Sequence, residues 1–129
     1  MIAVDTSVWV RYVTNDDPEQ GKRTLDVLSR PGGVFVPKTV LLELEWVLRA
    51  AYDLPAKAIG KALFHVIGLP DVQVETPDQV AMAMDLFTKG MDFADALHLA
   101  SIPCDVPLCT FDADFVKKAG AVGAAVEKI

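Results

Sequence analysis

Short apolar segments alternate along the chain with longer segments of helical periodicity, and this alternation constrains the fold more than any other feature. Most of these short segments are apolar throughout, as expected of strands that are buried on both faces of a parallel sheet. Helices between such strands cover the two faces of the sheet. The sequence therefore predicts an α/β fold of three layers, a small parallel sheet flanked by helices. The expected strands are 2–4, 34–36, 71–74, 106–110 and 121–125, and the expected helices are 6–13, 18–29, 40–52, 55–67, 77–89, 92–102 and 113–118.

Several residues mark where these helices begin and end. Asp17 followed by Pro18 is typical of an N-cap and a first helical position. Thr39 is expected to cap the third helix, and Gly90 is expected to end the fifth.

The composition limits the classes of protein to which the chain can belong. With 129 residues, of which 52% are hydrophobic, a single folded domain over 1–129 is expected. No apolar run is long enough to span a membrane, and no basic segment precedes the first apolar stretch, so we expect neither a membrane anchor nor a signal peptide. Cys104 and Cys109 form no disulfide framework and indicate reduced thiols in the cytoplasm. The net charge of −6 argues against a broad basic surface for nucleic acid, although a metal ion can neutralise an acidic centre locally.

Acidic residues stand at positions where an isolated carboxylate is costly. Each lies at the end of an expected strand or within an apolar helix, where burial of an unpaired charge costs several kcal/mol. Mg²⁺ and Mn²⁺ prefer oxygen ligands and would offset this charge. Right-handed crossovers bring the carboxyl ends of parallel strands to one edge of a sheet, where the acids following separate strands would meet. The acids in question are Asp5, Glu43, Asp95, Asp112 and Asp114.

A structural role is open for each acid taken singly. Asp5 and Asp112 both suit the N-cap of the following helix, which is compatible with metal binding because one carboxylate oxygen remains available. Ser7 could support Asp5 through a hydrogen bond, and Thr110 could hold a ligand or a phosphate. Asp114 could be an acid in the first turn that the helix dipole favours.

The remaining acids are assigned by comparison with their neighbours. Glu45 has Arg49 four residues ahead and is expected to form a solvated ion pair, whereas Glu43 is expected beside the apolar face of its helix. Asp92 is interpreted as an N-cap, with Asp95 in the first turn of a largely buried helix and ionised there.

Other kinds of site are not supported. His65 and His98 are interpreted as structural, because a site rich in carboxylates suits Mg²⁺ rather than zinc. No phosphate-binding glycine loop and no GxSxG nucleophile motif occurs.

The acidic positions and their surroundings resemble those of PIN-domain nucleases. The similarity extends over essentially the whole chain and is carried by Asp5 within IAVDTSVW, Glu43 within LELEWVL, Asp95 within DFADALHLA and Asp112 within TFDADF. The small size resembles the VapC-type toxins of prokaryotic toxin–antitoxin pairs.

This resemblance implies a function, a site and partners. It implies a PIN-like fold and Mg²⁺- or Mn²⁺-dependent endoribonuclease activity on RNA. It implies an acidic quartet of Asp5, Glu43, Asp95 and Asp112, with Asp114 as an auxiliary metal ligand. A homodimer and a cognate antitoxin are further implications, and RNA contacts are expected from local basic residues such as Arg11, Lys22, Arg23, Lys38 and Arg49.

Two other functions remain open on the sequence alone. One is a catalytically silent PIN-like module that binds RNA or a protein partner, for which Trp9, Trp46 and Phe87 could form a groove, although a core position is expected for at least two of them. The other is a Mg²⁺-dependent phosphohydrolase of the haloacid-dehalogenase kind, but Ser7 stands where that class places its second Asp.

Overall fold

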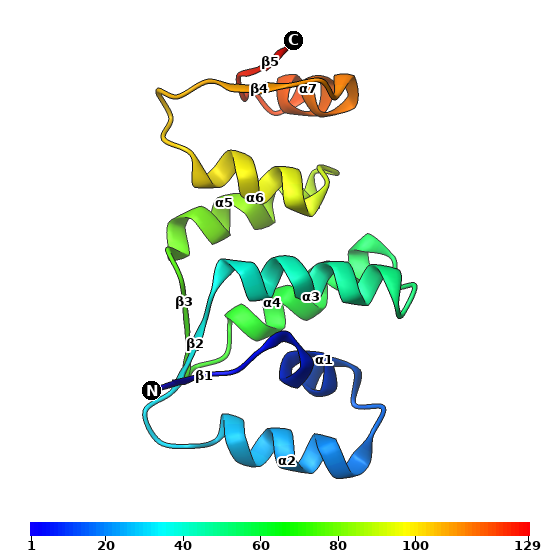
Figure 1. Cartoon of the computed structure of the whole chain (residues 1–129), viewed down its shortest axis with the longest axis vertical. Helices are drawn as coiled ribbons and strands as arrows, with labels where there is room; N and C mark the ends of the chain where they lie inside the picture. The colour runs from blue at the N-terminus through cyan, green and yellow to red at the C-terminus, as the bar shows by residue number, and fades with distance from the viewer. The chain divides into compact units, whose positions relative to one another are not determined.

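A computed structural model describes residues 1–129, which divide into two compact units, Met1–Pro77 and Asp78–Ile129 (Figure 1). Unit 1 contains β1 (Ile2–Ala3), α1 (Thr6–Thr14), α2 (Pro18–Leu28), β2 (Val34–Val36), α3 (Lys38–Ala50), α4 (Ala56–Ile67) and β3 (Val72–Val74), with Pro77 at its end. Unit 2 contains α5 (Pro77–Thr88) from Asp78 onward, α6 (Phe93–Ser101), β4 (Leu108–Thr110), α7 (Ala113–Ala121) and β5 (Val126–Lys128).

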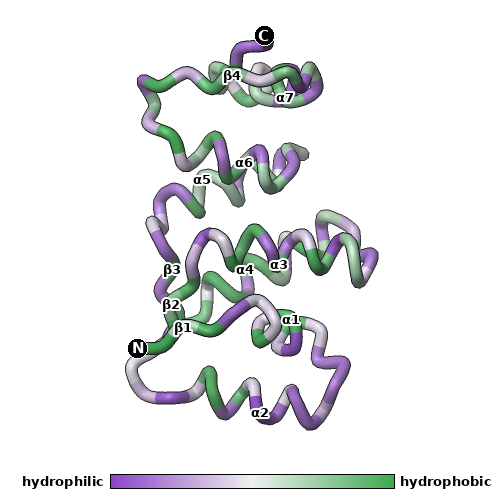
Figure 2. Tube along the Cα trace, in the orientation of Figure 1, coloured by the Kyte–Doolittle hydropathy of each residue, from purple (hydrophilic) through white to green (hydrophobic).

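Unit 1 is built on a parallel sheet of three strands in the order β1-β2-β3. The central strand, β2, pairs Val34 with Ile2 on one side and with Val72 on the other. Both Val34 and Val36 are buried, which explains the unbroken apolar sequence of this strand. Figure 2 shows the green of hydrophobic residues along β1 and β2.

The helices of unit 1 begin where the sequence predicts capping residues. The Asp5 side chain caps α1 and the Asp17 side chain caps α2, with Pro18 at the first helical position of α2. Helix α1 packs against α2 and α3, and α3 packs against α4. The largest fully buried side chains of this unit are Trp9, Leu41, Leu44, Leu48, Ile59 and Leu63.

Helix α3 buries a different face from the one that the sequence analysis predicts. The buried residues are Leu41, Leu44, Glu45 and Leu48, so Glu45 faces inward and Glu43 is exposed. The prediction of a solvated Glu45 is therefore wrong. Apolar residues lie on more than one side of this helix, so their periodicity did not select the buried face.

Thr39 does not cap α3. The helix begins at Lys38 after Pro37, and no side chain of its own N-terminal residues caps it. Instead, the backbone N–H of Lys38 donates a hydrogen bond of 2.9 Å to Oε1 of Glu75. A residue that is distant in sequence thus satisfies a free backbone donor at this helix start.

Unit 2 consists of three helices and a two-stranded parallel sheet, β4-β5. Phe87 of α5 and Phe93 of α6 meet edge to face with ring centroids 5.4 Å apart. Gly90 lies between these helices with a φ of 101°, in the left-handed region that favours glycine. Helix α7 packs on both β4 and β5. The last strand begins at Val126, not at 121 as predicted, because α7 continues to Ala121.

The predicted α/β class, with small parallel strands flanked by helices, is confirmed, since every strand pair is parallel. The strands form two sheets, however, and β1 and β4 belong to different ones. Asp5 and Asp112 therefore follow strands of different sheets, not strands that share one edge as predicted. No helix has both the length and the apolar character that crossing a membrane would require.

Candidate functional site

Asp5 lies between β1 and α1, and its carboxylate uses one oxygen to cap the helix. Oδ1 accepts hydrogen bonds from the backbone N–H of Ser7 at 3.1 Å and from the Ser7 hydroxyl at 2.5 Å. Both bonds fall on the same oxygen, so Oδ2 of Asp5 is left for another partner. The predicted support of Asp5 by Ser7 is confirmed as a hydrogen bond.

Glu43 lies on the exposed side of α3. Its carboxylate accepts no hydrogen bond and forms no ion pair within unit 1. Glu45, two residues along, is 3% exposed and receives Arg49 Nε at 2.9 Å and Nη2 at 3.3 Å. Of the two glutamates, only Glu43 has a carboxylate that is open to a metal ion.

Asp112 repeats the arrangement of Asp5 at the junction of β4 and α7. Its Oδ1 accepts hydrogen bonds from the backbone N–H of Asp114 at 2.9 Å and of Phe115 at 3.2 Å. Oδ2 takes part in neither bond. Thr110 Oγ1 in turn accepts the backbone N–H of Asp112 at 3.0 Å and so holds the turn that carries this carboxylate.

Asp114 differs from the other acids because it has a cationic partner. Its Oδ2 forms an ion pair of 3.1 Å with Lys118, one turn along α7. Both side chains are largely exposed, so this pair is weak and does not prevent Asp114 from binding a cation. This ion pair was not predicted from the sequence.

Asp95 occupies the first turn of α6, where Asp92 is the N-cap as predicted, accepting the Asp95 N–H at 3.2 Å. Burial raises the pKa of Asp95 above its usual range, and the negative charges of Asp92 and Asp112 raise it further, against the smaller effects of His98 and Lys118. The negative charge of Asp112 therefore acts on the Asp95 carboxylate within unit 2. A bound cation would relieve this repulsion.

The donor chemistry of these acids fits Mg²⁺ or Mn²⁺, since every available atom is a carboxylate oxygen. Neither unit by itself brings three His, Cys, Asp or Glu side chains into an arrangement that would hold an ion. Asp5 and Glu43 lie in unit 1, and Asp95, Asp112 and Asp114 lie in unit 2.

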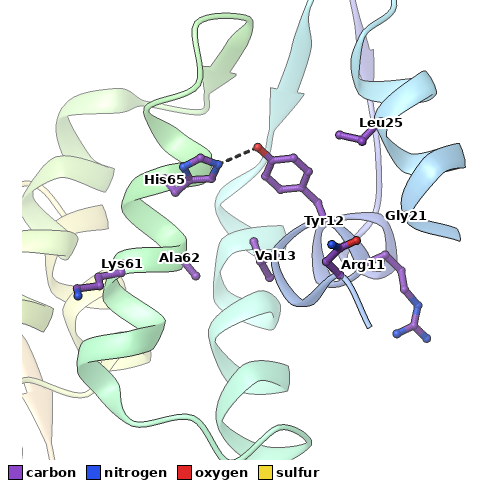
Figure 3. A pocket seen from close by; sticks show the side chains of 9 residues that line it. Arg11, Tyr12, Val13, Gly21, Leu25, Lys61, Ala62 and His65 are labelled. Carbon is purple, nitrogen blue, oxygen red and sulfur yellow. Dashed lines mark hydrogen bonds between the residues drawn. The ribbon is translucent and has the colours of Figure 1, made fainter. Parts of the chain in front are cut away.

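The histidine, cysteine and aromatic candidates differ in their surroundings. His65 is exposed, and its Nε2 lies 2.8 Å from the Tyr12 hydroxyl, with the two rings stacked. Figure 3 shows this pair at one side of a hollow of about 460 Å³, which Lys61 and Leu25 also line. Cys104 and Cys109 are free thiols. Trp9 and Phe87 belong to the core as expected, whereas Trp46 is exposed.

A polar network that was not predicted from the sequence surrounds Arg11. This side chain hydrogen-bonds to Gln20, Asp16 and Tyr52. The signal in the sequence was the run Asn15-Asp16-Asp17, whose first aspartate serves no helix cap.

Comparison with known proteins identifies the family. The model of the PIN domain family matches residues 2–121. The solved structures that are similar to this chain include VapC20 of Mycobacterium tuberculosis, which is described as a toxin that cleaves the sarcin–ricin loop. It is 25% identical, with 97% of each chain covered and a TM-score of 0.45. No curated protein matches the sequence. The family model covers far more than half of the chain, and the chain therefore belongs to the PIN domain family.

Proposed function

We propose that this PIN-domain protein is a metal-dependent endoribonuclease that hydrolyses phosphodiester bonds in RNA, as the toxin of a VapBC-type toxin–antitoxin pair. The proposed catalytic and metal-binding residues are Asp5, Glu43, Asp95 and Asp112, with Asp114 as a further ligand. The proposal includes a cognate antitoxin, a homodimer and a cytoplasmic location. Membership of the PIN family supports it, together with the availability of the carboxylates.

One observation carries the assignment of the site. Asp5 and Asp112 each cap a helix through Oδ1 alone and keep Oδ2 out of these bonds. A carboxylate that serves only as a helix cap gains no stability from neighbouring carboxylates, because they repel it. Here Asp112 raises the pKa of Asp95, and burial contributes more still, so the fold tolerates a repulsion that a cation would offset.

The residues of the chain have separable tasks in this mechanism. Mg²⁺ or Mn²⁺, when bound, supplies a Lewis acid for the phosphoryl group. Ser7 orients the Asp5 carboxylate through two hydrogen bonds, and Thr110 holds the backbone of Asp112. Glu43 contributes a carboxylate with no competing partner in unit 1. These contacts set the directions of the ligand oxygens before RNA binds.

Cleavage of a labelled single-stranded RNA by the purified protein tests the proposal. The wild-type protein is compared with Asp95→Asn in Mg²⁺, in Mn²⁺ and in EDTA. Asp92→Asn is the matched control, because it removes a charge from the same helix start while asparagine still caps the helix. We expect cleavage that needs metal, is lost in Asp95→Asn and persists in Asp92→Asn.

Two results would contradict the proposal. Cleavage by Asp95→Asn at the wild-type rate would remove this residue from the site. Absence of both cleavage and Mn²⁺ binding by calorimetry in the wild-type protein would instead indicate a silent binding module.

A further inference from the structure

A groove of about 450 Å³ runs between α1 and α2 in unit 1. We call it the α1–α2 groove. Its walls come from two helices of unit 1 that pack directly against each other. The lining residues include Ser7, Val8 and Arg11 from α1, and Gln20, Arg23 and Val27 from α2.

The α1–α2 groove is positively charged although the protein as a whole carries a net charge of −6. None of its lining residues is acidic, and two are arginines. Arg11 is held in place by Asp16, Gln20 and Tyr52, so its charge is partly neutralised. Arg23 is exposed and forms no ion pair. Arg23 is therefore the cation in this groove that is available to an anionic ligand.

Ser7 connects the α1–α2 groove to Asp5, one of the residues of the proposed catalytic site. Ser7 lines the groove and also donates both its N–H and its O–H to Oδ1 of Asp5. Ser7 thus contacts Asp5 and lines the same groove as Arg23, which would hold the anion. This continuity favours a ligand that also enters the catalytic site over an unrelated one.

The apolar part of the lining suits one unit of a nucleic acid strand. Val8 and Val27 are half-buried, one on each helix, and offer apolar surface to the face of a base. Single-stranded nucleic acids bind where cations follow the backbone and apolar or aromatic groups accept the bases. Gln20 and Ser7 add hydrogen-bonding groups between these surfaces.

We propose that the α1–α2 groove holds the segment of single-stranded RNA next to the bond that is cleaved, and that Arg23 contacts a backbone phosphate of this segment. This inference rests on the proposed ribonuclease function and assigns a substrate-binding residue to it. Phosphate contacts position a strand without reading its sequence. Arg23 is therefore expected to contribute affinity for every RNA, whatever its sequence.

RNA binding in EDTA tests this inference separately from catalysis. Fluorescence anisotropy of a fluorescein-labelled single-stranded RNA gives Kd for the wild-type protein, Arg23→Gln and Arg30→Gln at several salt concentrations. Arg30 is the matched control, because it is an exposed arginine just after α2 and does not line the groove. Both variants change the net charge by the same amount, and circular dichroism checks that both remain folded.

We expect Arg23→Gln to raise Kd roughly fivefold to tenfold, and Arg30→Gln to raise it by less than about twofold. One lost phosphate contact should also reduce the slope of log K against log salt by about 0.7 in Arg23→Gln. Equal effects of the two variants, or no effect of Arg23→Gln, would overturn the inference.

A third result would assign the groove to a different ligand. If a fluorescein-labelled oligoglutamate peptide bound to the wild-type protein and not to Arg23→Gln, while RNA binding was unchanged, the groove would dock an acidic protein segment and the RNA inference would be overturned. Failure of the proposed function is seen separately, as absence of metal-dependent cleavage by the wild-type protein. Selective loss of RNA binding in Arg23→Gln would support the groove assignment even then.

Discussion

The Tyr52 hydroxyl accepts a hydrogen bond of 3.2 Å from Nη1 of Arg11 and thereby joins the last turn of α1 to the turn that follows α3. The same hydroxyl donates to Oδ2 of Asp16 at 3.1 Å. Asp16 in turn accepts from Arg11 at 3.0 Å and from Thr14 at 3.1 Å. These bonds connect α1, which Asp5 caps, to the end of α3, which carries Glu43. Asp5 and Glu43 are the proposed site residues that lie in unit 1.

Tyr52→Phe should lower Tm by roughly 2–5 °C, because it removes the hydroxyl from two hydrogen bonds and leaves the ring in place. Thermal unfolding followed by circular dichroism measures this. Tyr12→Phe is the control, since the Tyr12 hydroxyl has one partner, the exposed His65. A Tm for Tyr52→Phe equal to that of Tyr12→Phe would show that the network contributes nothing beyond an exposed hydrogen bond.

Asp16→Asn should destabilise the protein at neutral pH and much less in acid. Burial raises the pKa of Asp16, but hydrogen bonds from Thr14 and Tyr52 and the charge of Arg11 outweigh it, so this pKa lies below its ordinary value of 3.8. A lowered pKa stabilises the folded protein above 3.8, and this stabilisation is lost as the pH falls through the folded value.

Urea unfolding of the wild-type protein and Asp16→Asn over a range of pH measures this difference. We expect the free energy of unfolding of the wild-type protein to exceed that of Asp16→Asn by a constant amount near neutral pH. This difference should become smaller below pH 3.8. A gap that stayed the same in acid would mean that the charge of Asp16 is not the source of its contribution.

Asp95→Asn should leave the metal-free protein as stable as the wild type or make it more stable at neutral pH. The pKa of Asp95 is raised, so the folded protein binds this proton more tightly than the unfolded chain does. Stability conferred by the protonated carboxyl is present below 3.8 and is lost as the pH rises through the folded pKa, whereas asparagine has no charge to lose.

Differential scanning fluorimetry with and without Mn²⁺ completes this test. A ligand that binds only the folded state raises Tm, so Mn²⁺ should stabilise the wild-type protein and not Asp95→Asn. If Mn²⁺ raised Tm equally in both proteins, the ion would bind elsewhere.

Glu45→Gln should lower the stability of the protein, whereas Glu43→Gln should abolish its activity. Glu45 is buried and paired with Arg49, so its replacement should cost about 1–3 kcal/mol of the free energy of unfolding. Glu43 is exposed and unpaired within unit 1, so its replacement should change stability by less than about 0.5 kcal/mol and still abolish RNA cleavage. Chemical denaturation and the cleavage assay, applied to both variants, measure the two effects. Loss of activity in both with loss of stability in neither would contradict this division.

Local features of the fold could be predicted from the sequence, and non-local ones could not. The caps at Asp5, Asp17, Asp92 and Asp112 were correct because an N-cap depends on residues within one helical turn. The cap of α3 by Glu75 was missed because its two partners lie far apart in sequence.

The same distinction applies to the orientation of α3 and to the sheet. Val40, Leu44 and Val47 form one helical stripe and Leu41, Leu44 and Leu48 another, and only tertiary packing selects between them. The pairing of β4 with β5 in a sheet of their own is likewise absent from any local pattern. The identities of the predicted acids came from motifs. Arg23 was one of five basic residues expected to contact RNA, and its place in the α1–α2 groove follows only from the packing of α1 on α2.

The two oxygens of the Asp5 carboxylate have different roles. Oδ1 caps α1, and Oδ2 is left for the proposed metal ion. Oδ1 receives both bonds from Ser7, and asparagine would present a carbonyl oxygen to the same two donors. A single exchange of oxygen for an amide nitrogen would then preserve the start of α1 while removing a ligand. A lineage of this protein could in this way lose its proposed enzymatic activity in one step and keep its architecture, so an inactive descendant would remain well folded and free to acquire another role.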